Sequence, residues 1–244
     1  MRKKNPQNLP RLPSVTEPTS ETSLDPLGPP ADVSAIRKEI EAFFKSLAED
    51  GQRIGRQQWG IYAFFDYDGE PIYVGQTYEG LGSRIGRHLT NQRTDAVAMN
   101  VLDPFEVCEI RVWPLNVSAI PEEERRDYLD RAEFTVFQKV IAESKIGAIL
   151  NEKPPRQTQV IELPKSYGRR IIPADIFPER QHPDIRLARR AATIASLDRR
   201  ISERSVKRGL RTTLLVQAKR LERLAEARLN DFPEGAEDED QKED

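Results

Sequence analysis

Side chains able to bind anions and to move protons are grouped in the middle of the sequence. Arg84 and His88 lie four residues apart in a segment that we predict to be helical, so both would occupy one face of that helix. An arginine presents a planar, permanently charged group that suits phosphate oxygens, and a histidine titrates near neutral pH. This pair therefore predicts an anion-binding site with a proton-transfer group beside it.

Two short motifs typical of strands precede this pair. Gly60-Ile61-Tyr62 and Tyr73-Val74-Gly75 lie on either side of Asp68-Gly69, a strong turn signal, and together they predict a β-hairpin. Glu133 follows inside a long predicted helix, and Asn151 follows that helix. Each residue alone has an ordinary explanation, since tyrosines are common packing residues in strands and helix surfaces carry many acids. Their joint occurrence in this order is what indicates a site.

This ordered set, over about a hundred residues, resembles the GIY-YIG nuclease family. The resemblance implies an α+β fold with a small three-stranded sheet flanked by helices. It implies hydrolysis of phosphodiester bonds in DNA, or less favourably RNA, with one divalent ion, Mg²⁺ or Mn²⁺, held by Glu133. The residues for which the resemblance implies a catalytic role are Tyr62, Tyr73, Arg84, His88 and Glu133.

The roles that the resemblance implies differ from residue to residue. Arg84 would stabilise charge on the phosphate, and Tyr62 would act as general base or relay for the attacking water. Whether Tyr62 or His88 takes the proton from water is open. Gly75, Arg87 and Asn151 are predicted to border the substrate, with Asn151 also tying the end of the domain to the site. Gln76 departs from the basic or small residue that many relatives carry at that position.

Apolar spacing and turn residues predict the elements that position these groups. Helices are expected from about 81 to 93 and from 121 to 144, and a third strand at 105–113. The added C-terminal region is predicted to be helical. The predicted organisation is a disordered tail at 1–31, a helix at 32–51, the nuclease domain at 56–157, a linker at 158–182, a basic helical region at 183–230 and an acidic disordered tail at 231–244.

The net charge of −2 hides a strong asymmetry along the chain. Residues 184–230 carry thirteen Arg or Lys against five acids, whereas residues 233–244 carry seven acids and one lysine. A basic segment suits a polyanion such as DNA. The same pattern is equally explained by an apolar stripe that packs on the nuclease domain, with the arginines facing water. Self-association of these helices into a homodimer is a third alternative.

The composition restricts the other function classes. Cys108 is the single cysteine and there are two histidines, which excludes an internal disulfide and a histidine-rich or thiolate metal cage. No stretch reaches the length of a membrane span, and we expect a cytoplasmic protein without a membrane partner. Two competing hypotheses remain beside the nuclease: a non-catalytic nucleic-acid-binding module of the same fold, and an interaction protein built around the C-terminal helices.

Overall fold

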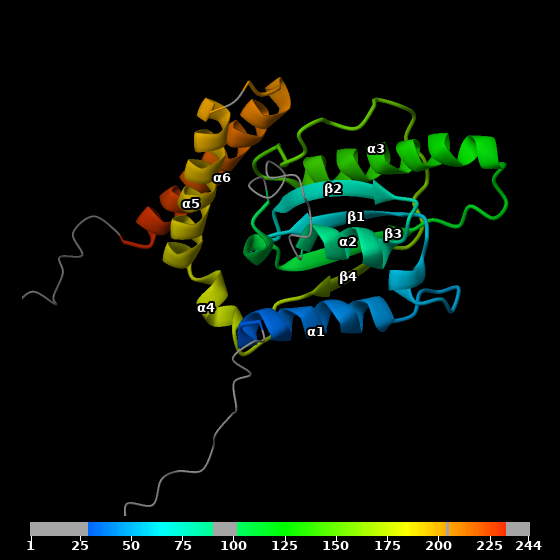
Figure 1. Ribbon diagram of the computed structural model, residues 1–244, viewed down its shortest axis with the longest axis horizontal. Coiled ribbons are helices and arrows are strands. Elements are labelled where there is room, and N and C mark those ends of the chain that lie inside the picture. The colour runs from blue at the N-terminus through cyan, green and yellow to red at the C-terminus, as the bar shows by residue number, and fades with distance from the viewer. Residues whose placement is uncertain (1–28, 90–101, 204, 233–244) are drawn as a thin grey trace, which may run out of the picture. The chain divides into compact units, whose positions relative to one another are not determined.

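The computed structural model describes residues 29–89, 102–203 and 205–232 (Figure 1). The strands are β1 (Gly60–Phe65), β2 (Pro71–Thr77), β3 (Glu109–Pro114) and β4 (Tyr167–Arg170). The helices are α1 (Ala31–Lys45), α2 (Leu81–Leu89), α3 (Arg125–Glu143), α4 (Phe177–Gln181), α5 (Pro183–Glu203) and α6 (Arg208–Asn230), with short 3-10 turns η1 (Ile54–Arg56), η3 (Pro104–Glu106) and η4 (Glu122–Glu124). The predicted tails and the end of the helix predicted at 81–93 lie largely outside the described residues.

The hairpin predicted from the turn signal is present. Strands β1 and β2 pair antiparallel, and Tyr62 is the register partner of Gly75. Gly69 has a φ of 71°, a left-handed conformation that glycine adopts without steric cost, so the turn forms where the sequence places it. The register brings the two tyrosine-bearing motifs side by side.

The sheet separates two apolar cores (Figure 1). On one face, Tyr62 and Phe64 of β1 join side chains from α1, α2 and the C-terminal helices. On the other face, Ile61, Ala63 and Phe65 pack against α3. This alternation follows from the two-residue period of a strand, and full burial of β1 explains why its sequence is apolar throughout.

The sheet has four antiparallel strands in the order β2-β1-β3-β4, so the expected three-stranded sheet was wrong in its strand number. Strand β4 lies inside the segment predicted to be a linker and pairs with β3. Its sequence, Tyr-Gly-Arg-Arg, has no apolar alternation that could indicate a strand. The strand forms because β3 offers a free edge and because Arg169 donates to Glu39 of α1 at 2.7 Å.

The C-terminal helices α5 and α6 pack on each other and on the end of the β1–β2 hairpin. Three of their arginines, Arg186, Arg190 and Arg220, are almost fully buried. Arg190 and Arg220 both donate to Asp66, at 3.0 and 2.5 Å. These arginines are therefore used within the chain and are not free to face a nucleic acid. The helices pack on the nuclease domain, as the packing alternative expects, but these three arginines are buried and do not face water as that alternative had it.

A second acid completes this buried cluster. Arg190 also donates to Glu106 at 2.9 Å. Burial raises the pKa of Glu106, although the charges of Arg190 and Arg186 act in the opposite direction. Removing one partner from such a cluster leaves an uncompensated buried charge, which makes the docking of α5 and α6 sensitive to single substitutions.

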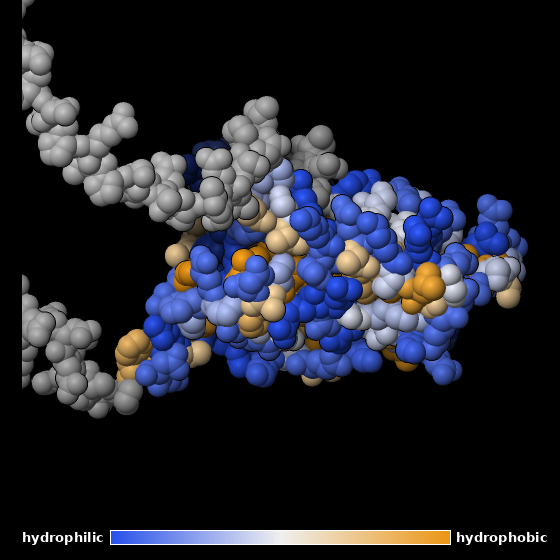
Figure 2. Space-filling view, turned by 90° about the horizontal axis from the view of Figure 1, so that it is seen from below, coloured by the Kyte–Doolittle hydropathy of each residue, from blue (hydrophilic) through white to orange (hydrophobic). Residues whose placement is uncertain are grey.

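The face that carries α1 is mostly hydrophilic, with apolar residues in small separate patches (Figure 2). Within the described ranges, none of the helices is both long enough and apolar enough to cross a membrane. Backbone contacts group residues 31–244 into one unit and residues 1–30 into another, of which only Pro29 and Pro30 are described.

Candidate active site

Tyr62 and His88 meet beneath helix α2. The Tyr62 hydroxyl lies 2.9 Å from His88 Nε2, a hydrogen-bonding distance, and both side chains are buried. Strand β1 supplies the tyrosine from the face that α2 covers, and α2 supplies the histidine near its last turn. A phenol and an imidazole in direct contact can pass a proton between them.

Tyr73 completes an aromatic group around this contact. Its ring centroid lies 6.1 Å from that of Tyr62 and 5.2 Å from that of His88. Tyr73 comes from β2 and is only partly buried, so its ring borders solvent while Tyr62 lies deeper. The two tyrosines of the hairpin therefore lie side by side, and their catalytic roles stay a prediction.

Gly75 leaves the space that the two phenol rings occupy. A Cβ at this position would lie 2.5 Å from the Tyr62 hydroxyl and 2.8 Å from the Tyr73 ring. Both distances are shorter than van der Waals contact, so every other residue would push the tyrosines apart. The structure thus gives Gly75 a clear packing role, and its predicted contact with substrate stays a prediction.

Arg84 lies one helical turn before His88 on α2, and its guanidinium faces the tyrosines. Burial by itself would lower the pKa of Arg84, but the Tyr62 charge and hydrogen bond, with a further contribution from Tyr73, raise it above its ordinary value. The same attraction favours the phenolate form of Tyr62. Arg84 Nε is buried and, among the described residues, has no hydrogen-bond partner. This buried N–H is a donor that no described residue satisfies.

Glu133 reaches the site from α3 at the outer edge of β2. Gln76 Nε2 donates to Glu133 Oε2 at 3.1 Å and to Asp130 Oδ1 at 2.9 Å, so one amide joins two carboxylates. Burial, together with the charge of Asp130, raises the pKa of Glu133 to about 7, while Gln76 and Arg84 act in the opposite direction. The arrangement concentrates negative charge beside the arginine and the tyrosines.

Asp130, Glu133 and Gln76 suit a divalent cation. Hard ions such as Mg²⁺ prefer carboxylate and amide oxygens and keep several waters. Gln76 Oε1 is buried, with no hydrogen-bond partner in the described part of the chain. In that same part, no group of three His, Cys, Asp or Glu side chains is placed to hold a metal. The residues present therefore fit an ion with few protein ligands and open positions for water and phosphate.

The side chain of Asn151 hydrogen-bonds to the backbone of the edge strand β2. Its side-chain amide donates to the Val74 carbonyl at 2.7 Å, and its Oδ1 accepts from the Val74 backbone N–H at 3.1 Å. The side chain thus replaces a neighbouring strand at the position between Tyr73 and Gly75. Asn151 ties the segment after α3 to the site, which is the structural part of its predicted role.

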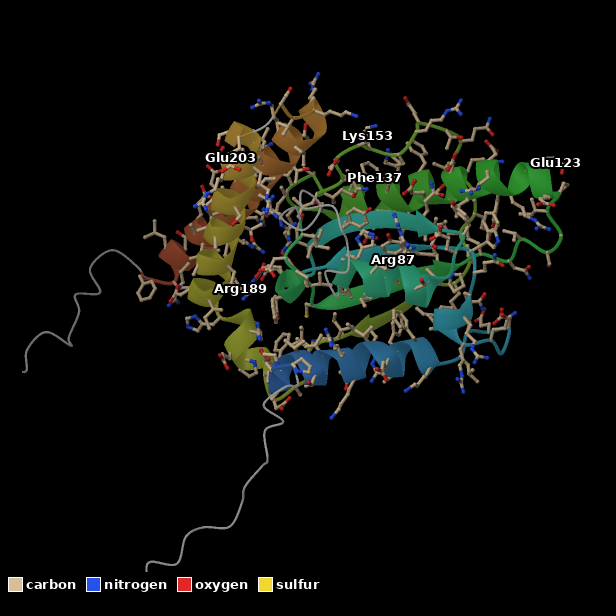
Figure 3. All side chains as sticks on the ribbon, in the orientation of Figure 1. Arg87, Glu123, Phe137, Lys153, Arg189 and Glu203 are labelled. Atoms are coloured by element: carbon tan, nitrogen blue, oxygen red, sulfur yellow. The ribbon has the colours of Figure 1, made fainter. Side chains whose placement is uncertain are left out.

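Arg87 lies apart from this group. Its guanidinium pairs with Glu79 at 2.5 Å in a half-exposed ion pair, on the solvent side of α2 (Figure 3). Such surface pairs contribute little to stability, so a phosphate could displace Glu79 at small cost. Contact between Arg87 and a substrate remains a prediction.

The structure brings Tyr62, Tyr73, Arg84 and His88 into one cluster, with Glu133 close enough to Arg84 for their charges to interact. Asp130 and Gln76 belong to the same site and were missed as members of it. The spacing of three residues between Asp130 and Glu133 places both on one helix face and was a usable signal. Gln76 had been noted only as a departure from the family pattern.

Fold and site together define an α+β domain with tyrosine, arginine, histidine and carboxylate side chains gathered at one sheet. Residues 58–128 match the family model of the GIY-YIG catalytic domain, which confirms the resemblance over this region and implies a function of nuclease type. Glu133 and Asn151 lie beyond the matched residues, and their placement rests on the structure. No curated protein and no solved structure matches the chain.

Proposed function

We propose that this protein is an endonuclease that hydrolyses DNA phosphodiester bonds with a divalent metal ion. The observation that carries the proposal is the 2.9 Å contact between the Tyr62 hydroxyl and His88 Nε2, beside Arg84. Burying a phenol against an imidazole and a guanidinium serves proton transfer near a charged substrate. Binding alone would not need it.

Glu133 and Asp130 would hold the ion. When bound, Mg²⁺ or Mn²⁺ supplies positive charge that stabilises the phosphate oxygens as charge builds up on them. Arg84, which is hydrogen-bonded to Tyr62, would donate a further N–H to a non-bridging phosphate oxygen, and this contact strengthens as the phosphorus takes on a fifth oxygen. Arg84 thus serves the substrate and Tyr62 at once.

The proton from the attacking water goes to Tyr62, and Tyr62 in turn gives its own proton to His88 Nε2. As the water oxygen forms its bond to phosphorus, the bond from phosphorus to the leaving sugar oxygen breaks. In this proposal Tyr62 acts as the base and His88 as the acceptor behind it, so the two residues work as a relay. Tyr73, at the solvent side, positions the water and the phosphate.

A plasmid-cleavage assay tests the proposal. We expect purified protein to nick or linearise supercoiled DNA in Mg²⁺ or Mn²⁺, and we expect EDTA and the Glu133→Gln variant to abolish this. The same assay with linear, branched and single-stranded DNA, and with RNA, defines the substrate. Cleavage that survives in Glu133→Gln would contradict the assigned metal site.

The non-catalytic binding module is the outcome if every nucleic acid is bound and none is cut in either metal. The third hypothesis, an interaction protein that uses α5 and α6, would be favoured by a dimer that forms without DNA together with absence of cleavage. Sedimentation velocity of the full chain measures that assembly. The buried arginines of these helices are already paired with Asp66 and Glu106. A dimer would therefore form through the exposed faces of α5 and α6.

A further inference from the structure

Trp59, Tyr78 and Arg126 form a cluster at one end of the candidate site. Trp59 directly precedes β1, Tyr78 directly follows β2, and Arg126 lies in the first turn of α3. The two ring centroids are 5.9 Å apart. The Arg126 guanidinium carbon lies 3.3 Å from the Tyr78 ring centroid and 6.0 Å from that of Trp59. The hairpin and α3 thus jointly hold one arginine.

The guanidinium of Arg126 contacts the two aromatic rings through its face, which leaves its N–H groups for a ligand. Cation–π contact engages the face of a guanidinium, whereas its N–H groups point outward from the edge. In the described ranges Arg126 has no ion pair and no hydrogen bond from its side chain, and it is exposed. Its neighbour Arg125 donates to the Ile120 carbonyl, and Arg131 pairs with Asp127. Arg126 therefore differs from the arginines around it.

This cluster lies along the same border between β2 and α3 as the carboxylates of Asp130 and Glu133. Gln76 contacts Asp130 and Glu133, and two residues further along the strand Tyr78 contacts Arg126. Arg126 precedes Glu133 by seven residues, which is about 10 Å along a helix that rises about 1.5 Å per residue. A DNA strand advances about 3.4 Å per nucleotide, so this distance spans about three nucleotides.

We propose that Trp59, Tyr78 and Arg126 form a subsite for a backbone phosphate of the bound DNA strand. Arg126 binds the phosphate, and the two rings hold the guanidinium in place before DNA arrives. The position about three nucleotides from the cut rests on the proposed nuclease function, whereas the phosphate contact itself does not. Holding the strand at a second point fixes the scissile phosphate beside Arg84 and Glu133.

The surrounding acids limit the subsite to one direct contact. Glu122 and Glu123 lie about one turn before Arg126, in the 3-10 turn η4 that leads into the outer end of α3 (Figure 3). Their charge would repel a DNA phosphate that did not touch the guanidinium. The subsite therefore contributes one phosphate contact and not a broad basic surface. A single contact has a defined signature, since each neutralised phosphate adds about 0.9 to the slope of log affinity against log salt.

DNA binding by the full-length protein in EDTA tests the subsite without cleavage. We would titrate a labelled duplex oligonucleotide, follow its anisotropy and repeat the titration across a salt series. Arg126→Gln should weaken binding about tenfold and lower the salt slope by about 0.9. Arg111→Gln is the matched control, because Arg111 also lies over an aromatic ring but is already paired with Glu109. That variant should leave the slope unchanged.

The chain carries its own reporter for this contact. It has two tryptophans, and Trp113 is only 2% exposed, so a change of emission on DNA binding reports on Trp59. We expect DNA to change that emission in the unmodified protein and not in Trp59→Phe or Arg126→Gln. An unchanged salt slope in Arg126→Gln, or emission insensitive to DNA, would overturn the subsite.

These outcomes separate the subsite from the nuclease function. A protein that binds DNA through Arg126 and cuts nothing in either metal keeps the subsite and loses the endonuclease. If the protein cuts DNA and the Arg126→Gln variant binds DNA as tightly as the unmodified protein, the endonuclease stands and the subsite does not.

Discussion

The Tyr62 hydroxyl and the Nε2 atom of His88 lie 2.9 Å apart in a site where both side chains are buried. They come from a strand and a helix, and the two residues lie 26 positions apart in the sequence. Arg84, one turn before His88, also interacts with Tyr62, which helps to raise the pKa of Arg84. In the relay proposed for this pair, the hydroxyl of Tyr62, and not its ring, transfers the proton.

The first prediction concerns that hydroxyl. Tyr62→Phe keeps the ring and the packing but removes the proton-transfer group, so we expect kcat for DNA cleavage to fall about 10²- to 10⁴-fold with little change in Tm. Tyr128→Phe, on α3 and facing the opposite core, is the control and should cleave normally. Full activity in Tyr62→Phe would remove this tyrosine from the relay.

The second prediction concerns Gly75. Gly75→Ala would place a methyl group 2.5 Å from the Tyr62 hydroxyl, so we expect a loss of about 1–3 kcal/mol in the free energy of unfolding and a loss of cleavage. Urea denaturation measures the first and the plasmid assay the second.

Gly86→Ala is the matched control for Gly75. It adds the same methyl group in α2, where, apart from the neighbouring helix backbone, no atom of the described residues lies within 4 Å of the new Cβ. Alanine favours a helix over glycine, so this variant should be as stable as the original protein or more stable. Equal stability of the two alanine variants would contradict the close packing around Gly75.

The third prediction concerns the pH dependence of metal binding. Burial and the charge of Asp130 raise the pKa of Glu133 to about 7, and only the ionised carboxylate binds a cation. Below that pH, protons compete with the metal, so the apparent affinity for Mn²⁺ should fall about tenfold per pH unit. Electron paramagnetic resonance of free Mn²⁺, without DNA, measures the affinity. Asp130→Asn should move the pH midpoint lower, and a midpoint that stays in place would refute this coupling.

The same group gives a fourth prediction, for the stability of the metal-free protein. The folded state keeps a proton on Glu133 up to a pH of about 7, because the pKa is raised there, whereas the unfolded state loses it near the ordinary glutamate pKa of 4.5. Stability should therefore decrease as the pH rises through this interval. Glu133→Gln removes the effect, and it should raise the Tm in EDTA more at pH 8 than at pH 5. An equal change at both pH values would show that Glu133 ionises normally.

The fifth prediction concerns the cluster that holds the C-terminal helices. Arg220→Met removes a buried partner of Asp66 and the donor to the Pro71 carbonyl, and we expect a loss of about 3–5 kcal/mol in unfolding free energy. Because Pro71 begins β2, cleavage should fall as well. Arg228→Met, which breaks a solvent-exposed pair with Asp184, should leave the denaturation midpoint almost unchanged. Similar effects of the two substitutions would contradict this assignment.

The order of motifs along the chain was enough to predict the hairpin, the helix of Arg84 and His88, and the family. Local rules decide these features: a turn dipeptide sets the hairpin, and a spacing of four residues sets a helix face. The candidate site residues lie close together because they stand on these regular elements, and their catalytic roles stay a prediction. The tyrosines of a paired hairpin have few possible neighbours once the register is set.

Other features depended on tertiary contacts that leave no local pattern. Strand β4 forms from a polar segment because β3 has a free edge, and Gln76 joins Asp130 to Glu133 because α3 crosses the outer edge of β2. The charge of the C-terminal helices was visible in the sequence, but their buried arginines were not. The sequence of a basic helix is the same whether its arginines pair with a phosphate or with a carboxylate such as Asp66. Only the folded chain brings Asp66 next to these arginines.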